Sequence, residues 1–518
     1  MFILSLLVVV LASLCTYSVV QRAILSINRR RFIREHNCIP VRRIPSKDPV
    51  LGSDVVFQSY KHLNTHSYLD LTRKRFLEHG NTFQAKMMGA RVYNTAEPEN
   101  IKTLLASRFD DFGLGKRRKS AFKSLIGHAI LNTDGTEWSH SRRFLRPSFA
   151  RDQWGDLAVL EKHVLNLVAQ IPRNESSVDL QELFFRMTMD TSTEIFFGES
   201  AYSLISSGNA EPRMLADAFN RAERTIAMDY VLGPFAVLSS HGTFSKDCKL
   251  LHGFVDNIVQ KALALCGTEN AMGEADKPCS EQGNERYVVL YELVKKTRNS
   301  LQLRSEVLGL LMAGRDSTAC LLSGLWFTLS RRQDIWTRLQ EEIAGLKGAK
   351  PDLGGLKEMK YLQACLNEAL RLYPPVPINS RTALVDTVLP LGGGPDGESP
   401  VFVPGGTVVG YNVFAMHRRE DLYGADAQEF NPERWETIRP GWGFLPFHGG
   451  PRMCLGQQLA LTEAAYTTVR LMQNFSAIKS HDSKPWIESL TLTCCSMNGT
   501  EIHLTPAGDG NNEHHKDL

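Results

Sequence analysis

The stretch that decides the fold lies near the C-terminus and reads Phe447-His448-Gly449-Gly450-Pro451-Arg452-Met453-Cys454-Leu455-Gly456. Three glycines and a proline within this stretch predict a tight, irregular loop. Residues 457–472 lack such breakers and predict a helix, so Cys454 lies just where a helix begins. The free N–H groups and partial positive charge of a helix N-terminus stabilise a thiolate. A single cysteine is more often a small buried apolar residue, so the neighbouring residues have to decide between the two interpretations.

The spacing Phe447-x-x-Gly450-x-Arg452-x-Cys454-x-Gly456 resembles the haem-ligand loop of the cytochrome P450 family. The resemblance implies that the Cys454 thiolate is the ligand of the iron in haem b, iron protoporphyrin IX. It also implies that Phe447 packs beside the sulfur and that Arg452 pairs with a haem propionate. We expect Gly450 and Gly456 to let the flat cofactor approach the backbone closely.

The longest predicted helix covers residues 299–331 and is interrupted by the polar segment Ala313-Gly314-Arg315-Asp316-Ser317-Thr318. Glycine alone costs an exposed helix about 1 kcal/mol, so a kink or a break between two helices is one interpretation. The other rests on a resemblance to the family's central-helix motif Ala/Gly-Gly-x-Asp/Glu-Thr-Thr/Ser, which forms an oxygen-binding groove.

This second resemblance implies a role for each residue of the groove. Gly314 leaves space for a small ligand, Asp316 relays protons and Ser317 supplies a hydroxyl group. The usual threonine is serine here, and the missing methyl group loosens the rotamer of Ser317. Thr318 is therefore a second candidate for the hydroxyl.

Three further matches lie elsewhere in the chain. Glu368 and Arg371 stand at i and i+3 on one helix face, and together with Arg434 they resemble the family's buried Glu-x-x-Arg and Pro-Glu-Arg network, a structural role. Trp138 and Arg142 resemble the Trp-x-x-x-Arg helix, which implies contact of both with a haem propionate. Arg381 matches another propionate position.

Arg143 and Arg146 follow Arg142 closely in the sequence. They lie either on a solvated face or on a docking face for an acidic reductase. By analogy with the family, the candidate pocket residues are Phe112, Leu308, Met312, 376–378 and 492–497.

Most of the remaining chain predicts helix. Helical patterns cover residues 67–78, 97–108, 136–148, 152–171, 178–197, 211–228, 246–266, 331–346 and 358–373, whereas strand-like patterns cover 82–94, 383–391, 400–409 and 488–505. Residues 267–287 lack periodicity and predict a surface loop. We therefore expect a mainly α fold with small β-sheets, which the family resemblance also implies.

The N-terminus predicts a membrane anchor. Residues 2–20 carry no charge and are long enough to span a bilayer, and arginines follow at positions 22, 29, 30, 31 and 34. Positive charge after the span places that side in the cytosol. A cleaved signal peptide is the alternative, but it needs positive charge before the apolar run. We expect an anchor over 1–21, a basic and proline-containing linker over 22–50, a catalytic domain over 51–506 and a polar tail over 507–518.

The amino-acid composition is that of an ordinary globular protein. The 518 residues are 43% hydrophobic and 22% charged, with a net charge of +3, so no basic excess indicates nucleic-acid binding. The ten cysteines show no CxxC spacing, which favours reduced intracellular thiols.

The resemblance implies a haem-thiolate monooxygenase that inserts one oxygen atom of O2 into a C–H bond. Its finer features resemble fungal alkane and fatty-acid hydroxylases, so an apolar aliphatic substrate or a polyketide-type intermediate of secondary metabolism is expected. Electrons would come from NADPH through a separate reductase, at the endoplasmic reticulum membrane, with a single span, contact with membrane lipid and the catalytic domain in the cytosol. Two alternatives stay open: a haem-thiolate isomerase or dehydratase, and a haem-binding sensor without turnover.

Overall fold

The computed structural model describes residues 2–149, 157–174, 176–205, 210–232, 242–271 and 287–508. The helices are α1 (Phe2–Glu35), α2 (Ser53–Asn64), α3 (Tyr68–His79), α4 (Pro98–Lys102), α5 (Lys116–Ile126), α6 (Gly135–Leu145), α7 (Ala158–Gln170), α8 (Leu180–Phe197), α9 (Ala210–Leu232), α10 (Gly242–Ala271), α11 (Val289–Lys296), α12 (Ser300–Leu329), α13 (Gln333–Ala344), α14 (Leu353–Glu358), α15 (Lys360–Leu372), α16 (Val413–Met416), α17 (Glu420–Tyr423), α18 (Arg434–Thr437) and α19 (Gln457–Asn474). The π-helical turn η1 (Thr103–Ser107) follows α4, and the short turn η9 (Gly450–Arg452) lies in the cysteine loop.

The strands are short and form small sheets. They are β1 (Thr82–Met87), β2 (Ala90–Thr95), β3 (Phe112–Gly113), β4 (Val178–Asp179), β5 (Ile378–Ala383), β6 (Thr387–Gly393), β7 (Ser399–Val403), β8 (Val408–Asn412), β9 (Phe475–Ser480), β10 (Glu488–Leu490), β11 (Cys494–Ser496) and β12 (Glu501–Pro506). One sheet has five strands in the order β1-β2-β8-β5-β3, a second has the order β4-β12-β9, and β6–β7 and β10–β11 form two-stranded pairs. The prediction of a mainly α fold with small sheets is confirmed.

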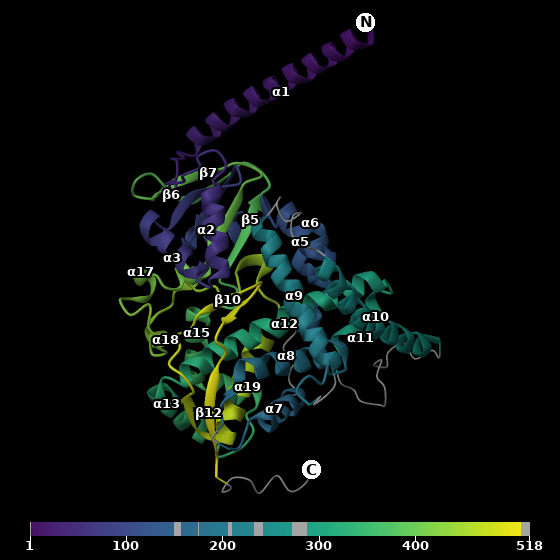
Figure 1. Cartoon of the computed structure of the whole chain (residues 1–518), viewed down its shortest axis with the longest axis vertical. Helices are drawn as coiled ribbons and strands as arrows, with labels where there is room; N and C mark the ends of the chain where they lie inside the picture. Colours follow the sequence, from purple (N-terminus) through teal and green to yellow (C-terminus); the bar gives the residue numbers. More distant parts are fainter. Residues whose placement is uncertain are drawn as a thin grey trace.

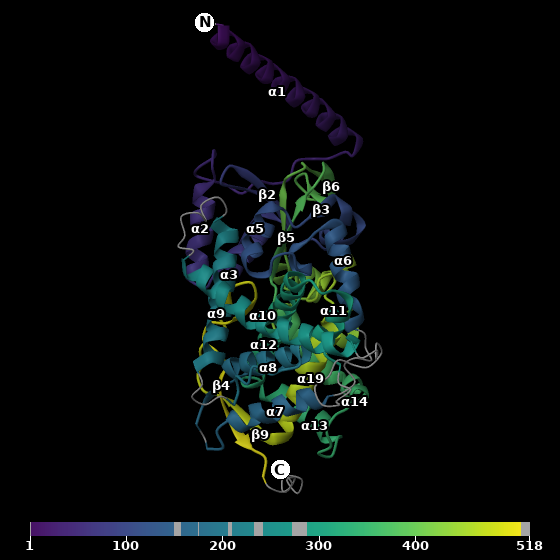
Figure 2. The same cartoon turned by 90° about the vertical axis from the view of Figure 1, so that its right-hand side faces the viewer.

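Helix α12 runs through the middle of the body in both views (Figures 1 and 2). The Asn299 side chain caps its first turn by accepting the N–H groups of Leu301 and Gln302 at 3.1 Å each. The helix continues unbroken past Gly314, so the alternative of two separate helices is wrong.

Two large hydrophobic clusters meet at α12 because its sequence is apolar on nearly all sides. One cluster joins it to α8, α15 and α19, and the other joins it to α8, α9, α10 and α11. Burial of each leucine side chain in such a cluster stabilises the fold by about 1.5–3 kcal/mol. The central helix is therefore fixed from opposite sides and provides a rigid support for its polar segment.

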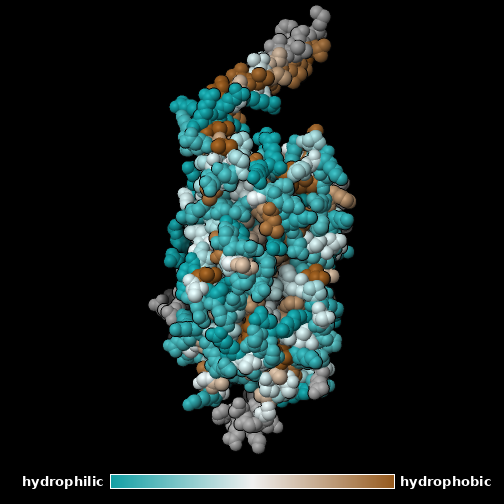
Figure 3. Space-filling model, turned by 90° about the vertical axis from the view of Figure 1, so that its left-hand side faces the viewer, coloured by the Kyte–Doolittle hydropathy of each residue, from teal (hydrophilic) through white to brown (hydrophobic). Residues whose placement is uncertain are grey.

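Helix α1 leaves the body at the end opposite the C-terminus (Figures 1 and 2). Within the described residues, one helical segment, Val10–Glu35, is apolar and long enough to cross a membrane, with a hydropathy of 1.5 and none of it buried. Figure 3 shows brown, apolar side chains along the outer part of α1 and hydrophilic ones where it meets the body. This pattern fits a membrane anchor.

The basic end of α1 docks on the β6–β7 pair. The Arg29 guanidinium donates two hydrogen bonds to Asp386, at 2.8 and 2.9 Å, and the Phe32 ring lies 5.6 Å from that of Phe402. The first part of the segment predicted as a linker is thus helical. Its later part is extended and pairs with the body through Val41, opposite Gly393.

Several predicted boundaries need correction. Helices α2, α5, α11 and α14 and the four-residue helices α16, α17 and α18 were not predicted. Residues 267–271, predicted as loop, continue α10, whereas 272–286 lie outside the described residues, as do 150–156 of the helix predicted over 152–171 and most of the predicted tail.

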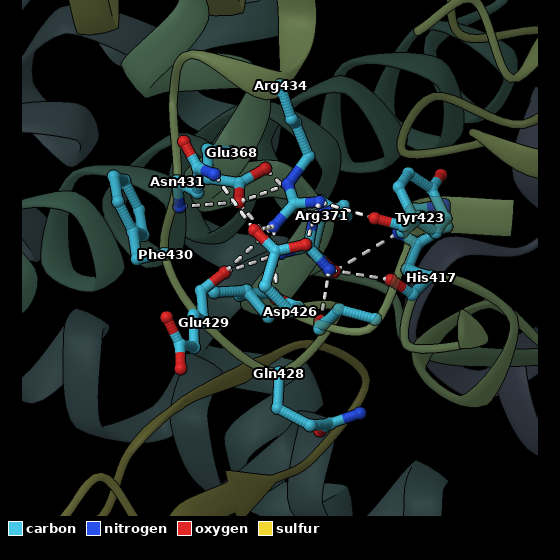
Figure 4. Close-up of polar contacts among 12 residues, drawn as sticks. Glu368, Arg371, His417, Tyr423, Asp426, Gln428, Glu429, Phe430, Asn431 and Arg434 are labelled. Carbon is cyan, nitrogen blue, oxygen red and sulfur yellow. Dashed lines mark hydrogen bonds and ion pairs between the residues drawn. The ribbon is translucent and has the colours of Figure 1, made fainter.

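A buried ion-pair network joins α15 to the segment before the cysteine loop (Figure 4). Glu368 and Arg371 are both fully buried, and the Arg371 guanidinium donates to both Glu368 carboxylate oxygens, at 2.7 and 2.8 Å. It also donates to the backbone carbonyls of His417 and Ala427, at 2.8 and 2.6 Å. Arg434 donates from Nε to Glu368 Oε1 at 2.9 Å. These contacts match the predicted structural role of the three residues.

His417 extends this network toward the cysteine loop. Burial and the charge of Arg371 lower the pKa of His417 to about 3, so the ring is neutral. Its Nε2 accepts the backbone N–H of Leu445 at 3.0 Å, two residues before Phe447. The start of the cysteine loop is thereby fixed to α15.

We expect Arg371→Met to destabilise the protein strongly, because it leaves the Glu368 carboxylate buried with too little compensation. The free energy of unfolding in urea should fall by about 3–5 kcal/mol. Arg338→Met is the matched control, since Arg338 pairs with Glu433 on the surface and about half of each side chain is exposed. It should change the free energy by about 1 kcal/mol or less, and equal losses in the two variants would contradict the structural role of Arg371.

Candidate functional site

The cysteine loop closes on itself through its backbone. The Cys454 N–H donates to the Phe447 carbonyl at 3.0 Å, and the Met453 N–H donates to the Gly450 carbonyl at the same distance. Helix α19 begins at Gln457, directly after Gly456. Cys454 therefore lies where the sequence predicts it, between a tight loop and the start of a helix.

Cys454 is a free, exposed cysteine. The surrounding protein raises the pKa of the thiol by removing water, whereas a hydrogen bond from the Gly456 backbone and the charge of Arg142 lower it. The backbone at the start of the helix and Arg142 thus favour the thiolate. Without a bound metal, the loss of water around the sulfur has the larger effect, so the pKa of the thiol is raised. A bound cation at the sulfur would reverse that balance.

The two loop glycines serve different purposes. Gly450 has a φ of +67°, and a Cβ atom there would meet the Leu105 carbonyl oxygen of η1 at 1.9 Å. The missing side chain of Gly450 therefore lets the loop pack against η1, and an approach of a cofactor to Gly450 stays a prediction. A Cβ at Gly456 would meet only the Phe149 ring, at 3.7 Å, which is ordinary contact.

Three predicted residues meet beside the loop. The Trp138 ring of α6 lies 4.6 Å from the Arg452 guanidinium and 5.8 Å from that of Arg142. Arg142 donates to the Met453 carbonyl at 3.0 Å, and Arg452 donates to Asp134 at 2.8 Å. Trp138 thus separates two guanidinium groups and holds both near Cys454.

Two further arginines, Arg381 and Arg118, belong to the same charge cluster. Arg381 of β5 is buried. Arg118 of α5 donates to the Asn379 side chain at 2.8 Å, and its Nε has no hydrogen-bond partner in the part of the chain that the structure describes. Burial, Arg381 and Arg118 together lower the pKa of His448 to about 3. His448 is therefore neutral and does not add to the charge.

This cluster carries more positive than negative charge. Burial and Arg381 lower the pKa of Arg452 to about 9, and burial and Arg381 also lower the pKa of Arg118. The Asp134 carboxylate acts on both Arg452 and Arg118. Asp134 also pairs with Lys119 at 3.0 Å. Such an excess of partly buried guanidinium groups fits a ligand with carboxylates of its own.

Of the predicted acid–hydroxyl pair on α12, Ser317 lies on an accessible face of the helix, whereas Asp316 is buried. Ala313 is exposed and Ser317 is half-buried, and the Ser317 hydroxyl donates to the Ala313 carbonyl at 2.7 Å. Thr318 and Asp316 are each only 2% exposed. Ser317, not Thr318, is therefore the hydroxyl on the accessible side of the helix.

Gly314 lies where α12 packs on α8. A Cβ atom there would meet Ser192 Oγ at 3.0 Å and the Phe196 ring at 3.1 Å, both on α8. The glycine therefore lets the two helices pack closely. Gly314 itself is half-buried, and its contact with a small ligand stays a prediction.

The predicted pocket residues differ in burial. Phe112, Leu308 and Met312 are buried in the hydrophobic core. Five positions of the ranges 376–378 and 492–497 are half-buried, on the segments around β5 and β11: Val376, Ile378, Leu492, Thr493 and Cys495. Four of these five residues have the apolar character expected of the pocket.

Comparison with known proteins decides the family. The family profile described as Cytochrome P450 matches residues 45–499. The chain belongs to the cytochrome P450 family. It is 42% identical to the cytochrome P450 monooxygenase himC of Aspergillus japonicus, over 94% of this chain and 87% of that protein. It is also 42% identical to cytochrome P450 monooxygenase fsdH of Fusarium heterosporum, over 97% and 88% of the two chains, and to cytochrome P450 52A12 of Debaryomyces hansenii, over 88% and 90%.

The family resemblance is thereby confirmed, and the chain is a P450 monooxygenase, whose family implies a haem cofactor. The residues present fit that group. The exposed thiol of Cys454 is a suitable axial ligand, and Arg118, Arg142, Arg381 and Arg452 supply the guanidinium groups that two propionates need.

Arg118 was not predicted from the sequence. It belongs to the run Lys116-Arg117-Arg118-Lys119, which by itself indicates a solvated basic face. Its place beside Arg381 depends on how α5 packs near β5, a tertiary contact that no local pattern encodes.

We expect Gly450→Ala to lower haem content and the thermal unfolding midpoint of the P450, because the added methyl group collides with backbone and the loop must shift. Gly441→Ala is the matched control. Gly441 also has a positive φ, +55°, but a Cβ there meets nothing within 4 Å. Haem per chain, measured by absorbance after extraction, should fall in the first variant and stay near normal in the second. Equal haem retention would contradict the close packing of the loop on η1.

Proposed function

We propose that this P450 is a membrane-anchored haem-thiolate monooxygenase that inserts one oxygen atom of O2 into a C–H bond of an apolar, aliphatic chain. The observation that most directly supports this proposal is the exposed Cys454 thiol within a cluster of guanidinium groups. Bound haem would supply the oxygen activation, and the protein would supply binding, orientation and protons.

Each part of the chain has a distinct task in this proposal. Cys454 would provide the thiolate ligand, and Phe447, the half-buried first residue of the loop, would pack beside the sulfur. Arg142, Arg381 and Arg452 pair with propionates. The half-buried Ser317 hydroxyl offers a hydrogen bond on the accessible side of α12.

The substrate class rests on the lining and on the relatives. Val376, Ile378 and Leu492 are apolar and half-buried near the ends of β5 and β11. The monooxygenases himC and fsdH and cytochrome P450 52A12 are each 42% identical to this chain, so sequence identity alone does not choose between substrates. Fatty-acid or alkane hydroxylation and the tailoring of a polyketide-type intermediate are therefore the two substrate classes to test.

The electron donor and the location form part of the same proposal. NADPH would supply electrons through a separate membrane reductase, and α1 would hold the catalytic domain on the cytosolic side of the endoplasmic reticulum membrane by a single span. The exposed Arg143 and Arg146 lie on and just after α6, next to the cysteine loop, and suit an acidic docking partner.

An isomerase, a dehydratase or a non-catalytic sensor is less favoured. Those proteins need no delivery of protons to oxygen, whereas this chain retains both Asp316 and Ser317 on the central helix. The retained pair favours oxygen chemistry.

Turnover tests this choice directly. With a P450 reductase in the same vesicles, we expect NADPH oxidation and hydroxylated product from at least one of a panel of alkanes, fatty acids and polyketide alcohols. Cys454→Ala should form no product, because the iron loses its thiolate. Product formation without NADPH, or full turnover by Cys454→Ala, would contradict the proposal.

Asp316→Asn should slow product formation while haem stays bound. A general acid typically contributes roughly 10²–10⁴-fold, so we expect a loss of about 10²-fold at saturating substrate. The measurement is the rate of hydroxylated product per haem, with haem content determined on the same sample. An unchanged rate would remove Asp316 from the proton supply.

A further inference from the structure

A buried polar cluster lies behind the accessible face of α12. The Arg315 guanidinium stands between the Phe185 ring of α8 and the Phe219 ring of α9, at 5.4 and 5.7 Å from their centres. It donates to Asp316 Oδ1 at 2.8 Å and to Asn220 Oδ1 at 2.9 Å. Arg315 and Asp316 are each 2% exposed, so the pair is shielded from bulk water.

Glu223 of α9 completes this cluster. It lies three residues after Asn220 and is 2% exposed, and its Oε1 has no hydrogen-bond partner among the described residues. Burial and the Asp316 carboxylate raise the pKa of Glu223 well above its usual value, although Arg315 opposes them. The groups that act on Glu223 are thus Asp316 and Arg315, both on α12.

The charges in the cluster determine its protonation. One guanidinium neutralises one carboxylate, and a second carboxylate would remain buried without a counter-charge. Two carboxyl groups in hydrogen-bond contact avoid this by sharing one proton. A protonated Glu223 beside an ionised Asp316 therefore gives the cluster a net charge of zero with Arg315.

We propose that Glu223 is a positioning residue that holds a proton against Asp316 and exchanges it with that carboxylate. In the exchange, the O–H bond of Glu223 breaks and an O–H bond forms on Asp316, so the pair keeps one proton and one negative charge. When Asp316 gives its proton to the accessible side of α12, water replaces it. Asn220, which contacts Arg315 and is itself exposed, marks the side of α9 nearest to solvent.

This inference rests on the proposed function, because only oxygen chemistry consumes protons at Asp316. It adds α9, a helix with no recognised motif, to the proton supply. The protonation of Glu223 can nevertheless be measured in the resting protein without any turnover.

The first test is infrared difference spectroscopy on the purified, haem-loaded protein. The wild-type spectrum minus that of Glu223→Gln should contain the carbonyl band of a protonated carboxyl group. Asp316→Asn should lose the same band, because Glu223 then ionises to balance Arg315. Asp217→Asn, which removes an exposed carboxylate from the same helix, should leave the band in place.

Absence of the band in the wild type, or its persistence in Asp316→Asn, would overturn the shared proton. A wild-type protein that shows the band but hydroxylates no substrate would instead count against the proposed function. The two failures are therefore distinguishable.

The second test measures how much of the oxidised NADPH yields hydroxylated product and how much yields peroxide. Glu223→Gln should form product about tenfold more slowly, since it acts through Asp316 and contributes less than a direct general acid. More of the oxidised NADPH should then appear as peroxide, with unchanged substrate affinity and a larger solvent deuterium effect, and Glu223→Asp should recover part of the rate. Product yield per NADPH equal to that of Asp217→Asn would overturn the proposal.

Discussion

The constraint on which the site depends is an excess of partly buried positive charge around the cysteine loop. Arg118, Arg142, Arg381 and Arg452 lie near the loop, and the Asp134 carboxylate acts on Arg118 and Arg452. Burial and Arg381 lower the pKa of Arg118 and Arg452, and a ligand with two carboxylates would relieve this repulsion. Cofactor binding and the local fold are therefore coupled, because the group that takes the thiolate also balances the arginines.

The rest of the fold keeps this cluster and α12 in place. The Glu368–Arg371 pair is fully buried and reaches the cysteine loop through His417 and Leu445, so α15 positions the thiolate from below. Two hydrophobic clusters enclose α12 and fix the position of its polar segment. Both supports lie in the densely packed part of the molecule, away from the surface loops.

Much of this could be predicted from the sequence, because the information is local. The cysteine loop, the start of α19 and the long central helix follow from spacing and composition. The buried role of the Glu368–Arg371 pair was expected from the family resemblance, because i, i+3 spacing alone is typical of a surface pair. The roles of Gly314 and Gly450 could not be predicted, since each depends on which neighbouring element faces the missing side chain. Glu223 was missed for the same reason: it is more than 90 residues from Asp316 in the chain and meets it only when α9 packs on α12.

The central claim is that the Cys454 sulfur ligates haem iron, and the carbon monoxide difference spectrum of the reduced protein tests it most directly. The account predicts an absorption maximum at the long wavelength typical of a thiolate-ligated haem, lost in Cys454→Ser. Purified protein without haem, or a carbonyl complex that absorbs like a histidine-ligated globin, would contradict the account.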